Sequence, residues 1–421
     1  MNKKNIVNYT GILGLYIFSV SLMVSKAGMN IGLGLMFLAV LFIDKQEEKI
    51  KLEEEQKYLY ILIILVPVFS LFSAGGINSF FICLEKTYRY IPIFLIPIFL
   101  KKSIKYRSLI YCIYISIIVN FINGLKFYQT KNWNFNLRYQ SYGVSLLDDA
   151  HMFSMLSFIV LAIIIYSFND KKYINFFISI VVYLIILLAL IFSQTRGAWL
   201  SFLGGLIFFY YFSAKNKKIA IITIISVFLL IYNLKNIDII EKNRYIKRWL
   251  SITDIQNDSP KIRILMWEGA VYSFKNNVIF GTGRDNSPKY ILEYLEKENK
   301  YSEVKNKSSL KVIAQTGNMH NMYFSSLAEE GVLFFYLLWI WSFILIKEIK
   351  FQKELKVQSL EYYIMNACIG LTVAFYITGL TENAWKNVWK TNVYLLGIAI
   401  YLTLKKVKRE NNDKEKNIIL Y

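Results

Sequence analysis

Runs of apolar residues long enough to cross a lipid bilayer recur along most of this 421-residue chain, and no other feature restricts its fold as strongly. Backbone polar groups find no water partner in a bilayer, so such runs must form helices, whereas a β-barrel would show short alternating segments. We therefore predict an all-α polytopic membrane protein with about 12 transmembrane helices. The predicted spans are residues 9–24, 29–43, 58–73, 79–100, 108–125, 150–168, 173–193, 197–213, 219–234, 321–346, 362–381 and 391–404.

The net charge of the chain, +20, could suggest a nucleic-acid partner, but its basic residues are dispersed between the apolar runs. We interpret the charge as a determinant of topology and of attraction to membrane lipid, and we expect no nucleic acid among the partners. The three cysteines all lie in apolar segments, so we expect neither a disulfide framework nor a cysteine-based metal site.

Lysines in alternate connections set the orientation, because basic residues stay on the cytoplasmic side. Lys3 and Lys4 precede the first run, which we interpret as a transmembrane helix rather than a signal peptide because further spans follow. With the amino terminus inside, an even number of spans returns the carboxyl terminus to the same side, in agreement with its basic tail.

The predicted spans divide the chain into four parts. Residues 1–234 hold transmembrane helices 1–9, and residues 235–320 form a large extracytoplasmic loop subdomain between helices 9 and 10. Helices 10–12 follow in residues 321–404, and residues 405–421 form a cytoplasmic basic tail, about the last ten residues of which look disordered. Within the loop, the pattern of residues 266–274 predicts a helix at the membrane surface.

Arginine is distributed differently from lysine. Lysine dominates every inside connection, whereas most arginines fall outside or at the outer boundary; these are Arg138, Arg196, Arg244, Arg248, Arg263 and Arg284. The planar, permanently charged guanidinium suits a diphosphate better than lysine does. For Arg244 and Arg248, chance placement with ordinary surface salt bridges is the favoured interpretation. Arg196 lies between two spans, and a boundary charge there indicates a functional site.

The chain has two histidines, and each begins a predicted span at the outer boundary. Histidine is the side chain best matched to proton transfer near neutral pH, so His320 is a candidate general base. For His151 we expect packing, and for the preceding Asp148 and Asp149 we expect a role in capping the helix.

Several segments resemble the O-antigen ligase and polymerase family. Residues 193–200 (Ser-Gln-Thr-Arg-Gly-Ala-Trp-Leu) resemble its serine/threonine-arginine-glycine-alanine motif. Residues 263–267 (Arg-Ile-Leu-Met-Trp) with 280–283 (Phe-Gly-Thr-Gly) resemble its large-loop arginine and glycine segment. Residues 320–323 (His-Asn-Met-Tyr) with 327–331 (Leu-Ala-Glu-Glu-Gly) resemble its histidine-asparagine-x-tyrosine segment and the following glutamate and glycine. The resemblance is strong over about residues 190–335.

The resemblance implies a glycosyltransferase in the bacterial cytoplasmic (inner) membrane, with its active site facing the periplasm. Family members move a glycan from a polyprenyl (undecaprenyl) diphosphate carrier to an acceptor, which is the lipid A–core in lipopolysaccharide ligases. They are regarded as metal-independent, and the chain contains no Asp-x-Asp, His-x-x-x-His or Glu-x-x-His pattern and no nucleotide-binding loop, so we expect neither a metal nor a cofactor.

For the implied reaction, Arg196 and Arg263 are expected to clamp the diphosphate, with Arg138 or Arg284 as further clamp residues. His320 is expected to accept the proton of the acceptor hydroxyl or to orient it. Direct displacement would invert the anomeric centre.

Three other motif residues have structural interpretations. Glu329 is expected to pair within the bundle, with a chemical role as the alternative. Gly197 and Gly331 are expected to permit close helix packing.

Two rivals to a ligase stay open. A polymerase of lipid-linked repeats would use the same donor chemistry. A multi-spanning transporter would place charges around a midplane cavity, commonly with broken helices and paired repeats. The sequence does not determine the glycan, the acceptor, the linkage, the oligomeric state or the fold of the outer loop.

Overall fold

A computed structural model describes residues 3–43, 52–102, 106–135, 137–234, 258–304, 307–317 and 319–419. Every regular element in these ranges is a helix, which confirms the all-α prediction, and helix is found at each of the predicted spans. The elements are α1 (Lys3–Ser21), α2 (Lys26–Leu41), α3 (Glu54–Phe72), α4 (Gly76–Thr87), η1 (Tyr88–Tyr90), α5 (Pro92–Lys102), α6 (Tyr106–Thr130), α7 (Leu146–Asn169), α8 (Tyr173–Ser193), α9 (Arg196–Ser213), α10 (Lys217–Leu234), α13 (Asp258–Asn276), α14 (Ser287–Lys297), η3 (Lys300–Glu303), α15 (Lys307–Thr316), α16 (Met322–Glu330), α17 (Leu333–Gln352), α18 (Leu360–Thr381), η4 (Ala384–Lys386) and α19 (Val388–Ile419).

Five described helices are long and apolar enough to cross a membrane, namely α3, α6 from Ser108 onward, α7, α8 and α18. The total of about 12 spans therefore stays a prediction. Two predicted spans are interrupted. The predicted span 79–100 breaks at η1, where Pro92 starts a new helix and has no backbone N–H to donate. The predicted span 321–346 breaks at Gly331, whose φ of 58° cannot continue a right-handed helix.

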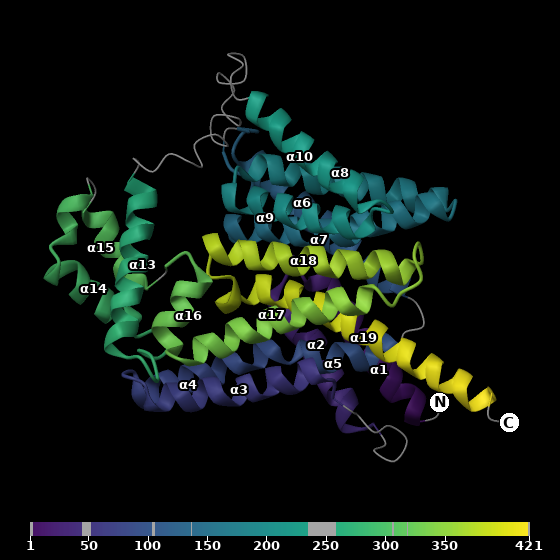
Figure 1. Ribbon diagram of the computed structural model, residues 1–421, viewed down its shortest axis with the longest axis horizontal. Helices are drawn as coiled ribbons and strands as arrows, with labels where there is room; N and C mark the ends of the chain where they lie inside the picture. Colours follow the sequence, from purple (N-terminus) through teal and green to yellow (C-terminus); the bar gives the residue numbers. More distant parts are fainter. Residues whose placement is uncertain are drawn as a thin grey trace.

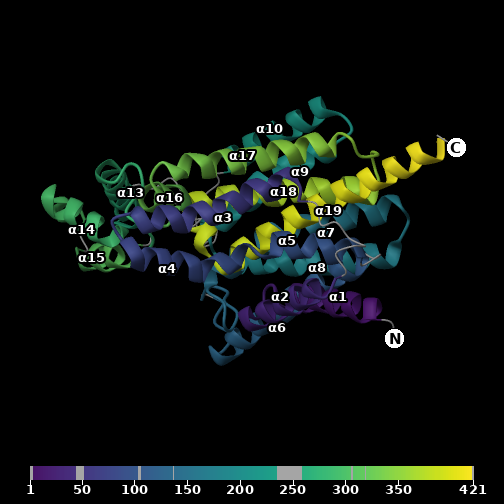
Figure 2. The ribbon, with the colours of Figure 1, turned by 90° about the horizontal axis from the view of Figure 1, so that it is seen from below.

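The long helices lie side by side as a bundle, and α13, α14 and α15 gather at one of its ends (Figures 1 and 2). Both chain termini lie at the opposite end. The gathered helices have a small apolar core of their own, to which Leu265, Ile291 and Leu310 contribute from α13, α14 and α15. The predicted surface helix is part of α13. Residues 235–257, with Arg244 and Arg248, lie outside the described residues.

Helices α7 and α18 form the centre of the bundle. In the most apolar 18-residue stretch of each, 72% and 78% of the residues are buried. Glycine allows α9 to approach α18 closely, because a Cβ at Gly205 would lie 2.6 Å from the Gly370 carbonyl oxygen. Gly197 faces Thr381 of α18 in the same way, with a Cβ position 2.3 Å from its hydroxyl, so the packing role expected for Gly197 is confirmed.

The carboxyl-terminal helix differs from the prediction. Helix α19 continues to Ile419, so the expected disorder of the final residues is wrong over most of that stretch. Ion pairs hold it where it leaves the bundle. The Lys405 ammonium lies 2.9 Å from Glu55, and the Arg409 guanidinium donates to both carboxylate oxygens of Glu53 at 2.9 and 3.0 Å.

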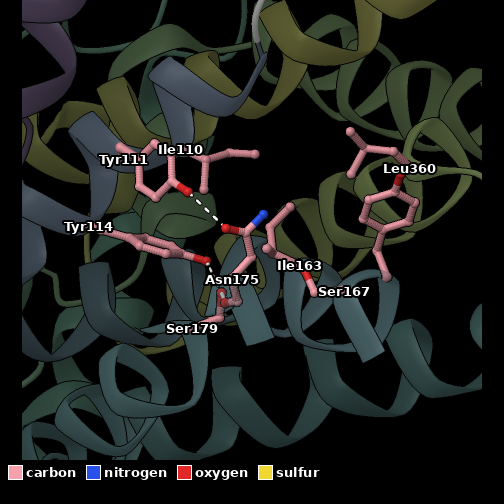
Figure 3. A pocket seen from close by; sticks show the side chains of 9 residues that line it. Ile110, Tyr111, Tyr114, Ile163, Ser167, Asn175, Ser179 and Leu360 are labelled. Atoms are coloured by element: carbon pink, nitrogen blue, oxygen red, sulfur yellow. Dashed lines mark hydrogen bonds between the residues drawn. The ribbon is translucent and has the colours of Figure 1, made fainter. Parts of the chain in front are cut away.

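A small cavity of about 30 Å³ lies among α6, α7 and α8 (Figure 3). Its wall contains two hydrogen bonds between α6 and α8, from Tyr111 to Asn175 at 3.0 Å and between Tyr114 and Ser179 at 2.7 Å. It has room for about one water molecule, so we do not interpret it as a substrate site.

Candidate functional site

The connection between α8 and α9 carries the first motif arginine. Gln194 adopts a left-handed backbone with φ of 49°, which turns the chain sharply so that Arg196 becomes the first residue of α9. Arg138 braces this turn, because its Nε donates to the Ser193 carbonyl at 3.0 Å and its Nη2 donates to the Thr195 hydroxyl at 2.8 Å. The structure thus places Arg138 against the backbone that presents Arg196.

His320 lies in the connection between α15 and α16, also with a left-handed backbone (φ 46°). Hydrogen bonds fix this connection on both sides. The Trp267 indole of α13 donates to the Met319 carbonyl at 2.9 Å. Asn321 caps α16 through its side-chain oxygen, and its amide donates to the Leu380 carbonyl at the end of α18 at 3.1 Å. These contacts hold His320 between the subdomain formed by α13, α14 and α15 and the bundle.

A carboxylate that sequence reasoning missed lies beside this histidine. The Nδ1 of His320 is 3.3 Å from Oε1 of Glu382, which directly follows α18. Burial alone would raise the pKa of Glu382, but its bond with His320 and the positive charge of Lys390 outweigh burial and lower the pKa to about 2. Glu382 is therefore an anion near neutral pH. The available sequence signal was an acidic residue at the outer end of a predicted span.

Arg263 comes to the same place from α13. Burial lowers its pKa; the Glu382 carboxylate counters this by raising it, and the Arg196 guanidinium lowers it further. Contacts of the neighbouring residues agree with this, because Gly197 faces Thr381, which precedes Glu382, and Trp267 of α13 bonds Met319, which precedes His320. Residues from α9, α13, the connection before α16 and the end of α18 therefore converge, and three of them (Arg196, Arg263 and His320) were predicted from the sequence.

A buried ion network supports this cluster from within the bundle. Lys390, which is 2% exposed, lies 2.9 Å from Oδ1 of Asp148 and 4.0 Å from Oε2 of Glu382. Asn387 donates to the same Asp148 oxygen at 2.8 Å. This network joins the start of α7 to the α18–α19 connection. Sequence reasoning missed Lys390, because in the sequence it is one lysine among many between two spans.

The residues at the start of α7 only partly match the prediction. The helix is capped by Ser145, whose hydroxyl accepts from the Asp148 amide at 3.2 Å, so the expected capping role of Asp148 and Asp149 is wrong. Asp149 instead accepts from the Ser141 amide at 2.7 Å, which ties the preceding loop to the helix. His151 is fully buried and lies 3.0 Å from the Thr378 hydroxyl, so its packing role is confirmed.

Arg284 lies in a separate polar cavity. The carboxylates that act electrostatically on its guanidinium are those of Glu329 and Glu330, whereas Glu382 acts on Arg263. Glu329 forms an ion pair with Lys386, as expected for a structural role. Among the described residues, no group of three or more His, Cys, Asp or Glu side chains is arranged to hold a metal ion.

The glycine segment before Arg284 packs on the end of α16. The Gly283 amide donates to the Glu329 carbonyl at 3.0 Å, and the Thr282 amide donates to the Ala328 carbonyl at 2.9 Å. The approach is so close that a Cβ at Gly331 would lie 2.5 Å from the Gly281 nitrogen. Gly331 therefore does permit close packing, although its partner is a loop rather than a helix. Two separate motif segments are thus brought together by backbone contacts.

The apolar helices and the attached helical subdomain define a multi-pass membrane protein with a polar cluster between the two parts. Residues 181–339 match the family model described as O-Antigen ligase, and this region contains Arg196, Arg263 and His320. The match over these residues supports membership of the chain in the O-antigen ligase family.

One curated relative is also similar to this chain. An uncharacterized protein of Haemophilus influenzae is 28% identical over 194 residues, which cover 42% of this chain and 44% of the relative. The matched part spans less than half the length of that relative, and its name indicates no activity.

Proposed function

We propose that this protein is an O-antigen ligase-like glycosyltransferase, which moves a glycan from a polyprenyl diphosphate carrier to an acceptor hydroxyl at the outer face of the cytoplasmic membrane. The observation that carries the proposal is the convergence of Arg196, Arg263 and the His320–Glu382 pair beside the outer subdomain. The lipid A–core is the proposed acceptor.

In the proposed reaction, the acceptor oxygen attacks the anomeric carbon and its proton passes to His320. Glu382 holds the imidazole through Nδ1, so Nε2 is the nitrogen that takes the proton. The carboxylate then stabilises the imidazolium that forms. The carbon–oxygen bond to the diphosphate breaks as the new bond forms, and its electron pair leaves with the diphosphate. Attack from the opposite face inverts the anomeric centre.

The two arginines act on the leaving group. Negative charge builds up on the diphosphate oxygen as the bond breaks, and Arg196 and Arg263 supply fixed positive charge where it develops. The positive charge of Arg196 acts on Arg263, so the cluster offers two guanidinium groups to a diphosphate beside the Glu382 carboxylate. Arg138 contributes by bracing the turn that carries Arg196.

A polymerase of lipid-linked repeat units is the second candidate, favoured equally by the same cluster because donor chemistry is shared. A transporter is less well supported, because Arg196, Arg263, His320 and Glu382 gather beside the α13–α15 subdomain, which lies at the end of the bundle away from the termini (Figure 1).

The test is glycan profiling of a deletion strain complemented with wild-type protein, His320→Ala, Arg196→Ala or Arg409→Ala. Arg409 is a matched control, since it is an arginine at the other end of the bundle, paired with Glu53. A ligase predicts loss of long-chain glycan on lipid A and accumulation of lipid-linked chains, with rescue by wild type and Arg409→Ala only. Accumulation of single lipid-linked repeats would identify the polymerase instead. Full rescue by His320→Ala and Arg196→Ala would refute the site.

A further inference from the structure

A second polar cavity, of about 300 Å³, lies apart from the His320–Glu382 pair. Three stretches of chain form most of its wall, namely the end of α4 with η1, the segment leading into α14, and the α18–α19 connection. The side chains that matter here are Lys86, Arg89, Arg284, Ser287, Asn383 and Lys386. The volume is at the lower end for ligand pockets, which suits one sugar-sized group.

Positive charge is in excess around this cavity. Lys86 is paired with Asp285 at 2.8 Å, and Lys386 is paired with Glu329. Two further guanidinium groups, those of Arg89 and Arg284, also line the wall. The carboxylate of Glu330 lies near Arg284, but it balances only one of these two charges. The cavity therefore favours an anion.

Several polar atoms of the wall are buried without a hydrogen-bond partner among the described residues. They include the hydroxyl of Ser287, which is fully buried, the Nε of Arg89 and the Oδ1 of Asn383. Leaving such an atom unpaired costs roughly 1–3 kcal/mol, so these atoms require polar partners in the cavity, which a polar ligand can supply. Arg89 requires an acceptor and Asn383 a donor, which together describe an anion that also carries hydroxyl groups.

The start of α14 points to the same chemistry. Ser287 is the first residue of this 11-residue helix, and the preceding Asn286 makes no side-chain capping bond. The amide groups at a helix start attract anions, and here they accompany a buried serine hydroxyl in the wall.

We propose that this cavity binds an anionic sugar, with a phosphate or carboxylate on Arg89 and Arg284 and hydroxyl groups on Ser287 and Asn383. The site is distinct from the proposed transfer chemistry. The cavity and the proposed transfer site share only the chain from Glu382 to Asn387. In this stretch Glu382 contacts His320, whereas Asn383, Lys386 and Asn387 line the cavity.

The test is equilibrium dialysis of the purified full-length protein in detergent with radiolabelled glucose 1-phosphate. We expect saturable binding, a Kd raised about tenfold or more by Arg89→Gln, and a smaller increase with Ser287→Ala. Lys289→Gln is the matched control, because Lys289 is exposed on α14 and does not line the cavity. Its replacement removes one positive charge, as Arg89→Gln does. Unlabelled glucose should compete weakly.

His320→Ala separates this inference from the proposed function. That variant should lose transfer yet bind glucose 1-phosphate with unchanged Kd. Absence of saturable binding, or equal weakening by Arg89→Gln and Lys289→Gln, would overturn the proposal. If inorganic phosphate competes as well as unlabelled glucose 1-phosphate, the cavity is a simple anion site and the sugar assignment is wrong.

Discussion

The Nδ1 atom of His320 lies 3.3 Å from Oε1 of Glu382, although the two residues are 62 positions apart in the chain. Asn321 makes this contact possible, because it caps α16 and also binds the end of α18. An imidazole held in this way has a fixed orientation, which a base needs before it can accept a proton from a defined direction.

Glu382→Gln should therefore lower the transfer rate by about 10²-fold or more, within the range expected for general-base assistance. Glu382 acts through His320, so the pH dependence of the rate should change as well, which a purely structural role would not cause. The measurement is initial rate against pH with purified protein and a lipid-linked donor. An unaltered pH profile with a reduced rate would count against the positioning role.

The same carboxylate predicts how stability depends on acidity. The pKa of Glu382 is lowered to about 2 from an ordinary value of 4.5, so its stabilising contribution is fully present above pH 4.5. That contribution is lost as the pH falls from about 4.5 to about 2 and amounts to no more than about 3 kcal/mol. Thermal unfolding in detergent should show a steeper acid decline for wild type than for Glu382→Gln; parallel curves would contradict this.

Gly197→Ala should destabilise the bundle by about 1–3 kcal/mol, because the new Cβ would lie 2.3 Å from the Thr381 hydroxyl. Gly34→Ala is a matched control, since Gly34 is also helical and a Cβ there meets nothing within 4 Å. It should be neutral or slightly stabilising. Adding Thr381→Ala should partly restore the stability lost in Gly197→Ala. Unfolding temperatures of the variants provide the comparison. Equal effects of the two glycine changes would show that the contact is unimportant.

Gly281→Ala combines two problems, a φ of 69° and a Cβ only 2.3 Å from the Glu329 carbonyl oxygen. Gly143→Ala has the first problem alone, because Gly143 has φ of 80° and nothing within 4 Å. Gly281→Ala should therefore cost about 1–3 kcal/mol more than Gly143→Ala. It should also lower transfer, since the segment organises the end of α16. Chemical denaturation of both variants tests the difference.

The candidate site was predictable where a residue contradicted its surroundings. Arg196 and Arg263 stood out as arginines where topology favours few basic residues, and His320 as a histidine at a boundary. Glu382 has no such contrast, and Lys390 was overlooked, because lysine was used only to assign topology. Their importance comes from burial and pairing, which depend on how α7, α18 and α19 pack.

The sequence by itself determined that this chain forms apolar helices with an extra polar segment before the last of them. That information is local, because burying each apolar run depends mainly on its own residues. Only the tertiary structure decided which polar groups meet. It placed Arg263 beside Glu382 and Arg284 in a different cavity, although both arginines come from the same predicted loop. Such pairing depends on the relative positions of helices far apart in the chain, which no single segment encodes.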